Sequence, residues 1–236
     1  MIRNYANLQI RLNGETQAAR ERMLYAVTAH MDALGMVACS RENAERTICL
    51  LPTDTGWAVF DDCADRLDIG ALDGLGRFLT RKLRTRGIGI LCAGDGLLLR
   101  LYGDGRLRDS YITSRHAFGR KTGGCSCFTC HGHALRWRAL IREGCGMKDL
   151  AETFSEGERE GRAVLPRLKY LLALDDSADF GFSSAGDREG VITLYFCAAN
   201  VVKQSLLGRL THPARRAATM LGAFVRPGGR CRSPKT

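Results

Sequence analysis

Apolar side chains recur with two different periods in the first part of the chain. Residues 8–12 alternate between apolar and polar side chains, which predicts a strand with one buried face. Residues 16–34 instead place apolar side chains three or four positions apart, which predicts a helix that Gly35 ends. Two short apolar runs, 47–51 and 56–61, flank a turn and predict a pair of strands.

The same two periods return between residues 68 and 112. Asp68 is suited to cap a helix whose leucines recur at helical spacing up to Leu83. Residues 88–92 predict a buried strand, and residues 97–112 predict a hairpin around Asp104-Gly105. This order predicts an α+β fold. Its antiparallel sheet would have ferredoxin-like (βαββαβ) order, an extension by the hairpin, and two helices covering one face.

The chain changes character beyond residue 114. Helical spacing predicts a C-terminal helical subregion, and two apolar runs, Phe180–Ser184 and Val191–Cys197, predict a late hairpin. We therefore expect four parts. They are an α+β sheet domain at 1–114, a Cys/His-rich loop at 115–133, the helical subregion with its hairpin at 134–202, and a basic, poorly ordered tail at 203–236.

The Cys/His-rich loop holds the densest group of candidate metal ligands in the sequence. These three thiols and two imidazoles are Cys125, Cys127, Cys130, His131 and His133. Such side chains can supply the four tetrahedral ligands of a zinc ion. Zinc sites usually combine two separated ligand pairs, however, and the sequence contains no second Cys-x-x-Cys. We therefore favour free thiols in an exposed loop and expect no cofactor, with zinc as the alternative.

Other chemistry can be drawn from the same loop or from nearby carboxylates. Cys127-Phe-Thr-Cys130-His131 matches the covalent haem-attachment motif, and Cys127 with Cys130 could form a dithiol redox pair. A Cys–His catalytic dyad is disfavoured, because residues adjacent in sequence seldom form one. The carboxylates Asp61 and Asp62 are expected to end a strand in solvent. No catalytic residue is assigned, and we expect a protein that is not an enzyme.

Positive charge is concentrated at the end of the chain. The formal net charge is +10, and the residues from Lys203 onward include eight Lys or Arg and no acid. Arginines in such a tail could contact phosphates without reading a base sequence. The candidates are Arg209, Arg215, Arg216, Arg226, Arg230 and Arg232. We expect at most weak, non-specific binding of nucleic acid through them.

Composition indicates a globular cytoplasmic protein. The chain has 236 residues, of which 45% are hydrophobic and 25% charged. No apolar run approaches the roughly 20 residues that span a bilayer, so we expect no membrane span. The first residues lack the apolar region of a signal peptide, so the ten cysteines are expected to stay reduced. Cys49, Cys92 and Cys197 lie in apolar runs and are expected to be buried.

Two segments carry a pattern shared with other proteins. Gly56–Asp62 fits a strand of the form W-x-V-[YF]-D-[DE]. Asp95–Ser114 is similar to a hairpin of the form D-x-L-x-x-x-L-Y-x-x-G-x-x-x-D-x-Y-x-S. In order and spacing they resemble a family of uncharacterised bacterial cytosolic proteins, which also has a helical segment similar to 162–174 and a last strand similar to 180–184. The resemblance implies a fold over roughly 57–184 and no reaction. The Cys/His-rich loop and the chain from Gly190 depart from it.

These observations favour a non-catalytic intracellular interaction or regulatory module that binds a protein partner. The main alternative is a zinc-stabilised nucleic-acid-binding protein that uses the Cys/His-rich loop and the basic tail. A thiol or haem redox protein is the third class. Metal analysis of the purified protein separates the first two classes, and a visible absorption spectrum tests the third.

Overall fold

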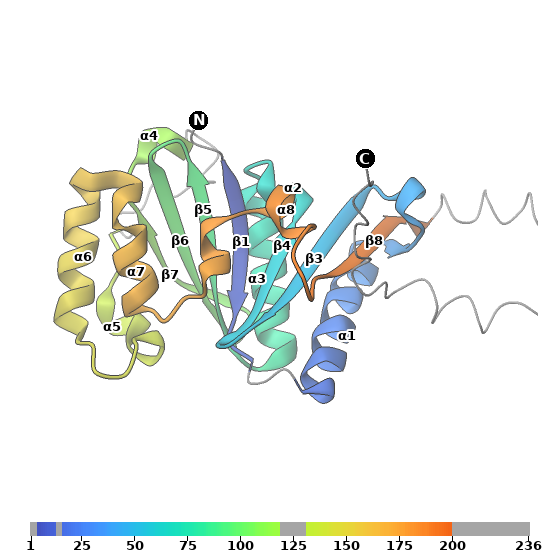
Figure 1. Ribbon diagram of the computed structural model, residues 1–236, viewed down its shortest axis with the longest axis horizontal. Helices are drawn as coiled ribbons and strands as arrows, with labels where there is room; N and C mark the ends of the chain where they lie inside the picture. The colour runs from blue at the N-terminus through green and yellow to red at the C-terminus, as the bar shows by residue number, and fades with distance from the viewer. Residues whose placement is uncertain (1–3, 13–15, 119–130, 200–236) are drawn as a thin grey trace, which may run out of the picture.

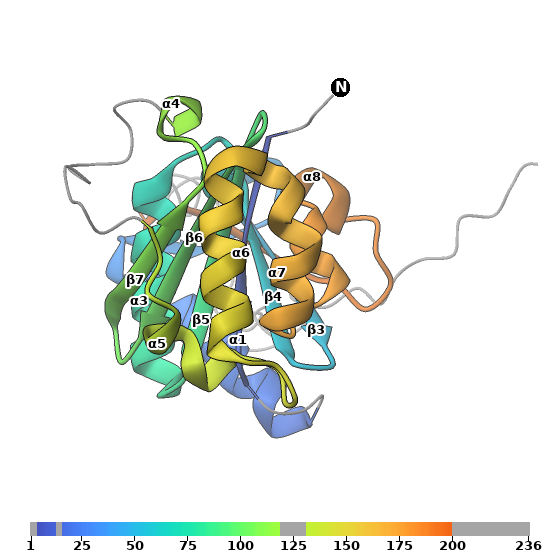
Figure 2. The same ribbon diagram turned by 90° about the vertical axis from the view of Figure 1, so that its left-hand side faces the viewer.

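The structure, a computed structural model, describes residues 4–12, 16–118 and 131–199 of the chain. It contains an eight-stranded antiparallel sheet with helices on both faces (Figures 1 and 2). The strands are β1 Tyr5–Ile10, β2 Met36–Ala38, β3 Arg46–Thr53, β4 Gly56–Asp61, β5 Arg86–Ala93, β6 Gly96–Gly103, β7 Arg106–Ile112 and β8 Ile192–Ala198. The α-helices are α1 Gln17–Ala33, α2 Asp62–Asp65, α3 Ile69–Leu83, α4 Arg115–Phe118, α5 Ala134–Trp137, α6 Met147–Glu160, α7 Leu165–Leu171 and α8 Phe182–Ala185. Short 3₁₀ helices are η1 Arg41–Asn43, η3 Arg138–Leu140, η4 Gly161–Val164 and η5 Asp176–Asp179.

The sheet order is β2-β8-β3-β4-β1-β5-β6-β7. The predicted mixed fold with an antiparallel sheet is therefore confirmed, but the sheet is larger than a ferredoxin-like one. The predicted late hairpin is wrong. Phe182–Ala185 is helical, and β8 pairs with β2 and β3 instead. The ring of Phe180 stacks on Phe60 at 5.2 Å, so this segment is held by packing on the sheet and not by strand pairing.

Two capped helices, α1 and α3, cover one face of the sheet. Asp68 Oδ1 accepts a hydrogen bond from Ala71 N at 3.0 Å, which confirms the predicted cap of α3. Thr16 caps α1 in the same way. The following side chains predicted for this layer are all buried in its core: Leu8, Ile10, Val27, Met31, Val59, Leu72 and Leu79. The first layer of the fold therefore follows from the two apolar periods.

The opposite face is covered as well, contrary to the single covered face that the sequence predicts. Helices α5, α6 and α7 lie on this side (Figure 1). Ile90, Leu99 and Leu101 lie in the predicted strands, and their side chains belong to this second core. Adjacent positions of a strand face opposite sides, so Leu98 and Tyr102 remain in the first core. Strands β5 and β6 are therefore buried on both sides along most of their length.

Strand β1 carries a polar stripe on this second face, made of the buried Asn7 and Gln9 and continued past the strand end by the partly buried Arg11. Asn7 is 1% exposed and Gln9 is 4% exposed. Asn7 Nδ2 donates hydrogen bonds of 2.9 to 3.3 Å to three carbonyl oxygens of residues 172–180, a segment that we call the strap. Arg11 Nη1 donates to a fourth at 2.9 Å. The half-buried strand predicted here is therefore wrong, because the strap carries carbonyl groups that only polar side chains can satisfy.

Two expectations from composition can be compared with the structure. Cys49, Cys92 and Cys197 are buried, as predicted, and the cysteines within the described ranges are free. No helix in those ranges is long and apolar enough to cross a membrane.

Candidate anion-binding cleft

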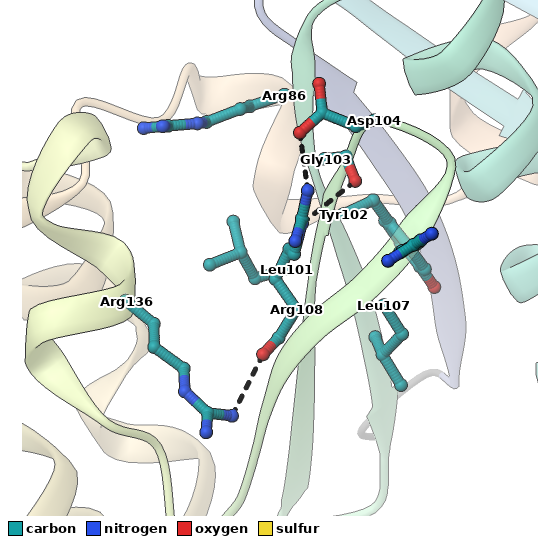
Figure 3. A pocket seen from close by; sticks show the side chains of 9 residues that line it. Arg86, Leu101, Tyr102, Gly103, Asp104, Leu107, Arg108 and Arg136 are labelled. Carbon is teal, nitrogen blue, oxygen red and sulfur yellow. Dashed lines mark hydrogen bonds and ion pairs between the residues drawn. The ribbon is translucent and has the colours of Figure 1, made fainter.

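One end of the sheet is hollowed between the β6–β7 hairpin and helix α5. The hollow has a volume of about 490 Å³. The charged residues that line it are four arginines and one carboxylate: Arg86, Arg106, Arg108, Arg136 and Asp104. We call this hollow the arginine cleft. Figure 3 shows that Arg108 reaches it from the hairpin and Arg136 from the facing helix.

Separate segments of the chain bring the four arginines together. Arg86 begins β5 and lies opposite Gly103, the last residue of β6. The hairpin turn then reverses the chain, with φ values of +52° at Asp104 and +76° at Gly105. Strand β7 therefore begins beside β6 and supplies the second and third arginines. Helix α5 supplies the fourth.

A buried carboxylate, Asp109, holds helix α5 against β7. Asp109 is 4% exposed, and its Oδ2 accepts hydrogen bonds from Trp137 Nε1 at 2.7 Å and from His133 N at 2.6 Å. Arg136 Nη1 donates to the carbonyl oxygen of Arg108 at 3.0 Å (Figure 3). Hydrogen bonds to a carboxylate are stronger than neutral ones. The wall of the arginine cleft that α5 forms is therefore held in place by hydrogen bonds to β7.

The arginines of the cleft differ in their protein partners. Arg108 Nη2 pairs with Asp104 at 2.5 Å, but the two side chains are 45% and 78% exposed. A solvent-exposed pair of this kind contributes about 0–1 kcal/mol. Within the described ranges, no hydrogen bond or ion pair reaches the guanidinium groups of Arg86 and Arg106, and both residues are exposed. Their donors are available to a ligand.

The charge of the cleft differs from that of the rest of the structure. The described residues contain as many acidic as basic side chains, whereas four arginines face a single carboxylate in the cleft. A hollow lined by one sign of charge raises the local concentration of oppositely charged ligands. The planar donor fork of arginine also matches the oxygens of carboxylate and phosphate groups. The arrangement is therefore suited to bind an anion.

The predicted metal ligands lie only in part within the described residues. Those outside are Cys125, Cys127 and Cys130. His131 forms a β-bridge with Tyr111, and its Nδ1 contacts Glu158 Oε1. His133 bonds to Asp109 through its backbone N. Metal binding by the loop stays a prediction, and the structure adds that one of its imidazoles has a carboxylate partner.

We predict that replacing Cys127 and Cys130 together by Ser changes stability little. Among the described residues, Phe118 is the buried core residue that the loop contributes, so the cores do not depend on the two thiols, and Glu158 contacts the His131 imidazole. The melting temperature of the C127S/C130S protein should lie within about 2 °C of the parent value, which corresponds to less than about 1 kcal/mol. Stoichiometric zinc in the purified parent, together with unfolding of the variant, would establish a structural zinc site instead.

Asp61, which was expected to end its strand in solvent, is buried. Its side chain is 1% exposed and accepts hydrogen bonds from Arg46 of β3 at 2.5 and 3.1 Å. Ligand atoms of Asp61, Asp62 and Cys63 lie within 4.8 Å of one another. Because the guanidinium group already neutralises Asp61, we interpret this cluster as a buried ion pair with partly buried neighbours and not as a metal centre.

Four cysteine thiols of the described part are poorly suited to catalysis. Burial raises the pKa of Cys63 to about 11 and that of Cys39 to about 12. Burial also raises the pKa values of Cys49 and Cys92. Catalytic cysteines need a lowered pKa, because the thiolate is the nucleophile. These thiols are therefore protonated at neutral pH.

The sequence predictions placed anion contacts in the tail and missed the arginine cleft. The tail residues Arg209, Arg215, Arg216, Arg226, Arg230 and Arg232 lie outside the described residues, so binding through them stays a prediction. A local signal exists in Arg106-Leu-Arg108 and Arg136-Trp-Arg138, where arginines alternate with an apolar residue. Only the packing of α5 on the hairpin shows that they share a surface with Arg86.

Comparisons of the chain with protein-family models, with curated proteins and with solved structures gave no match. The resemblance noted in the sequence therefore stays a prediction.

Proposed function

We propose that this chain is a non-catalytic binding module whose ligand carries phosphate groups, and that the arginine cleft binds them. The supporting observation is the convergence of four guanidinium groups on one hollow, two of them without a partner among the described residues. A phosphate group offers three strong acceptor oxygens, whereas a carboxylate offers two. It would therefore satisfy more of the available donors and offset more of the repulsion between the cations.

The lining of the cleft supports binding without catalysis. Among its described lining residues there is no His, Cys, Ser, Thr or Lys. The hydroxyl of Tyr102 is buried and donates to Asp73 at 2.7 Å, away from the hollow, and burial raises its pKa. Asp104 is exposed and paired with Arg108. Among the described lining residues, therefore, no side chain is placed to act as a general base toward a bound phosphate.

The proposal is tested by pyrophosphate binding to the full chain in calorimetry. Replacing Arg86 and Arg106 together by Ser should weaken binding at least tenfold, because each removes a hydrogen bond to a charged group worth about 1.5–3 kcal/mol. Both side chains are exposed and lack partners in the described part, so the fold should be unaffected. Unchanged melting temperature and circular dichroism would verify this.

A matched control removes two exposed arginines that lie outside the cleft. Arg41 lies in η1 and Arg159 near the end of α6, and both are exposed. The R41S/R159S protein loses the same charge and should bind pyrophosphate within about twofold of the parent, a difference below about 0.5 kcal/mol. Equal weakening in both double variants would show a net-charge effect and refute the cleft. Absence of pyrophosphate binding by the parent would refute the proposed function.

We also infer a ferredoxin-like core within the larger sheet. Strands β3, β4, β1 and β5 are consecutive in the sheet, and α1 and α3 pack on the same face. In chain order these elements read βαββαβ, which supports the predicted order. The free thiols support a reducing compartment such as the cytoplasm. A protein partner remains a proposal. The zinc-stabilised and redox alternatives remain proposals too, and the metal and absorption measurements test them.

A further inference from the structure

The arginine cleft continues into two further hollows on the same end of the molecule. The first has a volume of about 440 Å³ and shares Arg86 and Arg136 with the cleft. The second has a volume of about 810 Å³ and shares Arg86 and Ala139 with the first. The arginines that line the three hollows are Arg11, Arg86, Arg106, Arg108, Arg136, Arg138 and Arg142. We call this continuous surface the arginine track.

We propose that the arginine track binds the sugar-phosphate backbone of a single-stranded nucleic acid across several consecutive phosphates, without reading the bases. This inference rests on the proposed function and names its ligand. A single phosphate would occupy one hollow and leave the arginines of the other hollows without a ligand. A chain of phosphates can place one group near each hollow, and such contacts supply affinity that is independent of sequence.

The distribution of partners along the track favours a ligand with several charges. Arg11 is engaged by strap carbonyls, and Arg142 Nε donates to the carbonyl oxygen of Tyr170 at 2.9 Å. Arg138, by contrast, is exposed and has no hydrogen bond or ion pair to a described residue. Unpartnered arginines therefore occur in the middle hollow as well as in the cleft, where Arg86 and Arg106 lie.

The lining offers little for recognition of bases. Tyr102 and Trp137, which lie at the cleft and in α5, are both fully buried. Tyr170 is exposed, but the guanidinium carbon of Arg142 lies over its ring at 4.8 Å. Base recognition without sequence preference usually relies on exposed aromatic rings that stack with bases. The described lining has seven arginines against the carboxylates Asp54, Asp104 and Glu143 and no such exposed ring, so it should contact phosphates and leave the bases in solvent.

Concavity favours a single strand over a duplex. Each hollow is a depression between the sheet end and the helices α5 and η3, or the loop that follows them. A flexible single strand can follow such depressions, whereas a duplex presents its phosphates on a stiff convex surface. The track therefore fits one backbone at a time.

The experiment compares short and long ligands on variants of the full chain. Its probes are inorganic pyrophosphate and fluorescent oligothymidylates of increasing length, and its variant is Arg138→Ser with Arg159→Ser as control. Loss of Arg138 should leave the affinity for pyrophosphate within about twofold of the parent value. It should weaken binding of the eight-nucleotide oligothymidylate (the octamer) about three- to tenfold. It should also reduce the slope of log affinity against log salt concentration by about 0.7. The Arg159→Ser protein should match the parent on both probes. The basic tail is present in all three proteins, so it cancels in the comparison.

The outcomes separate this inference from the proposed function. If pyrophosphate binds at the cleft but Arg138→Ser and Arg159→Ser affect the octamer equally, the track is refuted and the cleft stands. If pyrophosphate does not bind, both are refuted. Equal dependence on Arg138 for a duplex, or for inorganic polyphosphate of matched charge, would overturn the assignment to single-stranded nucleic acid. An oligoadenylate should bind within about threefold of the oligothymidylate, and a larger difference would overturn backbone-only recognition.

Discussion

Replacing Arg46 by Met should lower the free energy of unfolding by about 3–5 kcal/mol at pH 8, as expected when one partner of a buried ion pair is removed. The Asp61 side chain would lose the guanidinium group that neutralises it while staying 1% exposed. Among the described residues, its remaining hydrogen bond would be the one that Cys63 N donates at 3.0 Å. Urea denaturation at constant pH would measure the loss.

The same variant should depend on pH in a defined direction. Burial raises the pKa of Asp61 even in the parent, and the Arg46 guanidinium opposes this effect. Without Arg46 the folded-state pKa rises further above the unfolded value, so the folded protein takes up a proton that the unfolded chain does not. The destabilisation should therefore be largest at high pH and shrink as the pH falls through the folded-state pKa.

The double variant Arg46→Met/Asp61→Leu provides the control. Replacing a whole buried ion pair by apolar side chains of similar size is often neutral, so the double variant should regain most of the lost stability. His30 is also buried, with a pKa lowered to about 4 by burial, but it is present in both variants. A double variant as unstable as Arg46→Met at pH 8 would show that packing, and not the unpaired carboxylate, causes the loss.

Replacing Asn7 by Leu should lower the free energy of unfolding by about 2–4 kcal/mol, because buried carbonyl groups of the strap would lose their donor. Asn7 Nδ2 donates to the carbonyl oxygens of Ser177, Ala178 and Phe180, and Gln9 Nε2 donates to Asn7 Oδ1 at 3.0 Å. Hydrogen exchange should show faster opening of the strap amides, while the amides of α1 follow only the global change.

Asn43→Leu is the matched control for this prediction. Asn43 is exposed and bonds only to Ser40 among the described residues, so its loss should change stability by less than about 0.5 kcal/mol. If Asn7→Leu were equally mild and the strap amides stayed protected, the polar stripe would not be what holds the strap on the sheet.

Apolar periodicity predicted the helices and strands near the N-terminus because each depends on residues that are close in sequence. The cap at Asp68 and the turn at Asp104-Gly105 depend on residues close in sequence, and both are confirmed. The second covered face was missed for the opposite reason. The apolar alternation of β1 indicated a polar face, and nothing local indicates that residues 172–180 would cover that face with carbonyl groups. The same limit explains β8, whose partners are distant in sequence.

The candidate site likewise combines features that the local sequence shows with contacts between distant segments. Each arginine of the cleft is visible in the sequence, yet the three segments that hold them are joined only by sheet register and by the buried contacts of Asp109. Net charge pointed to the tail because that segment lacks acids. A surface cluster in a body with balanced charge has no such compositional signal. The burial of Asp61 escaped prediction because its partner lies on the neighbouring strand.

The position of β8 between β2 and β3 has a consequence for synthesis on the ribosome. Strand β3 is made early, but the neighbour on one of its edges is translated after most of the rest of the chain described here. Until that neighbour emerges, the nascent β3 exposes unpaired backbone groups beside the apolar side chains of Ile48 and Leu50, an arrangement that invites pairing between molecules. In the growing polypeptide, this edge of β3 therefore needs protection from intermolecular pairing, for example by chaperones, until β8 has been translated.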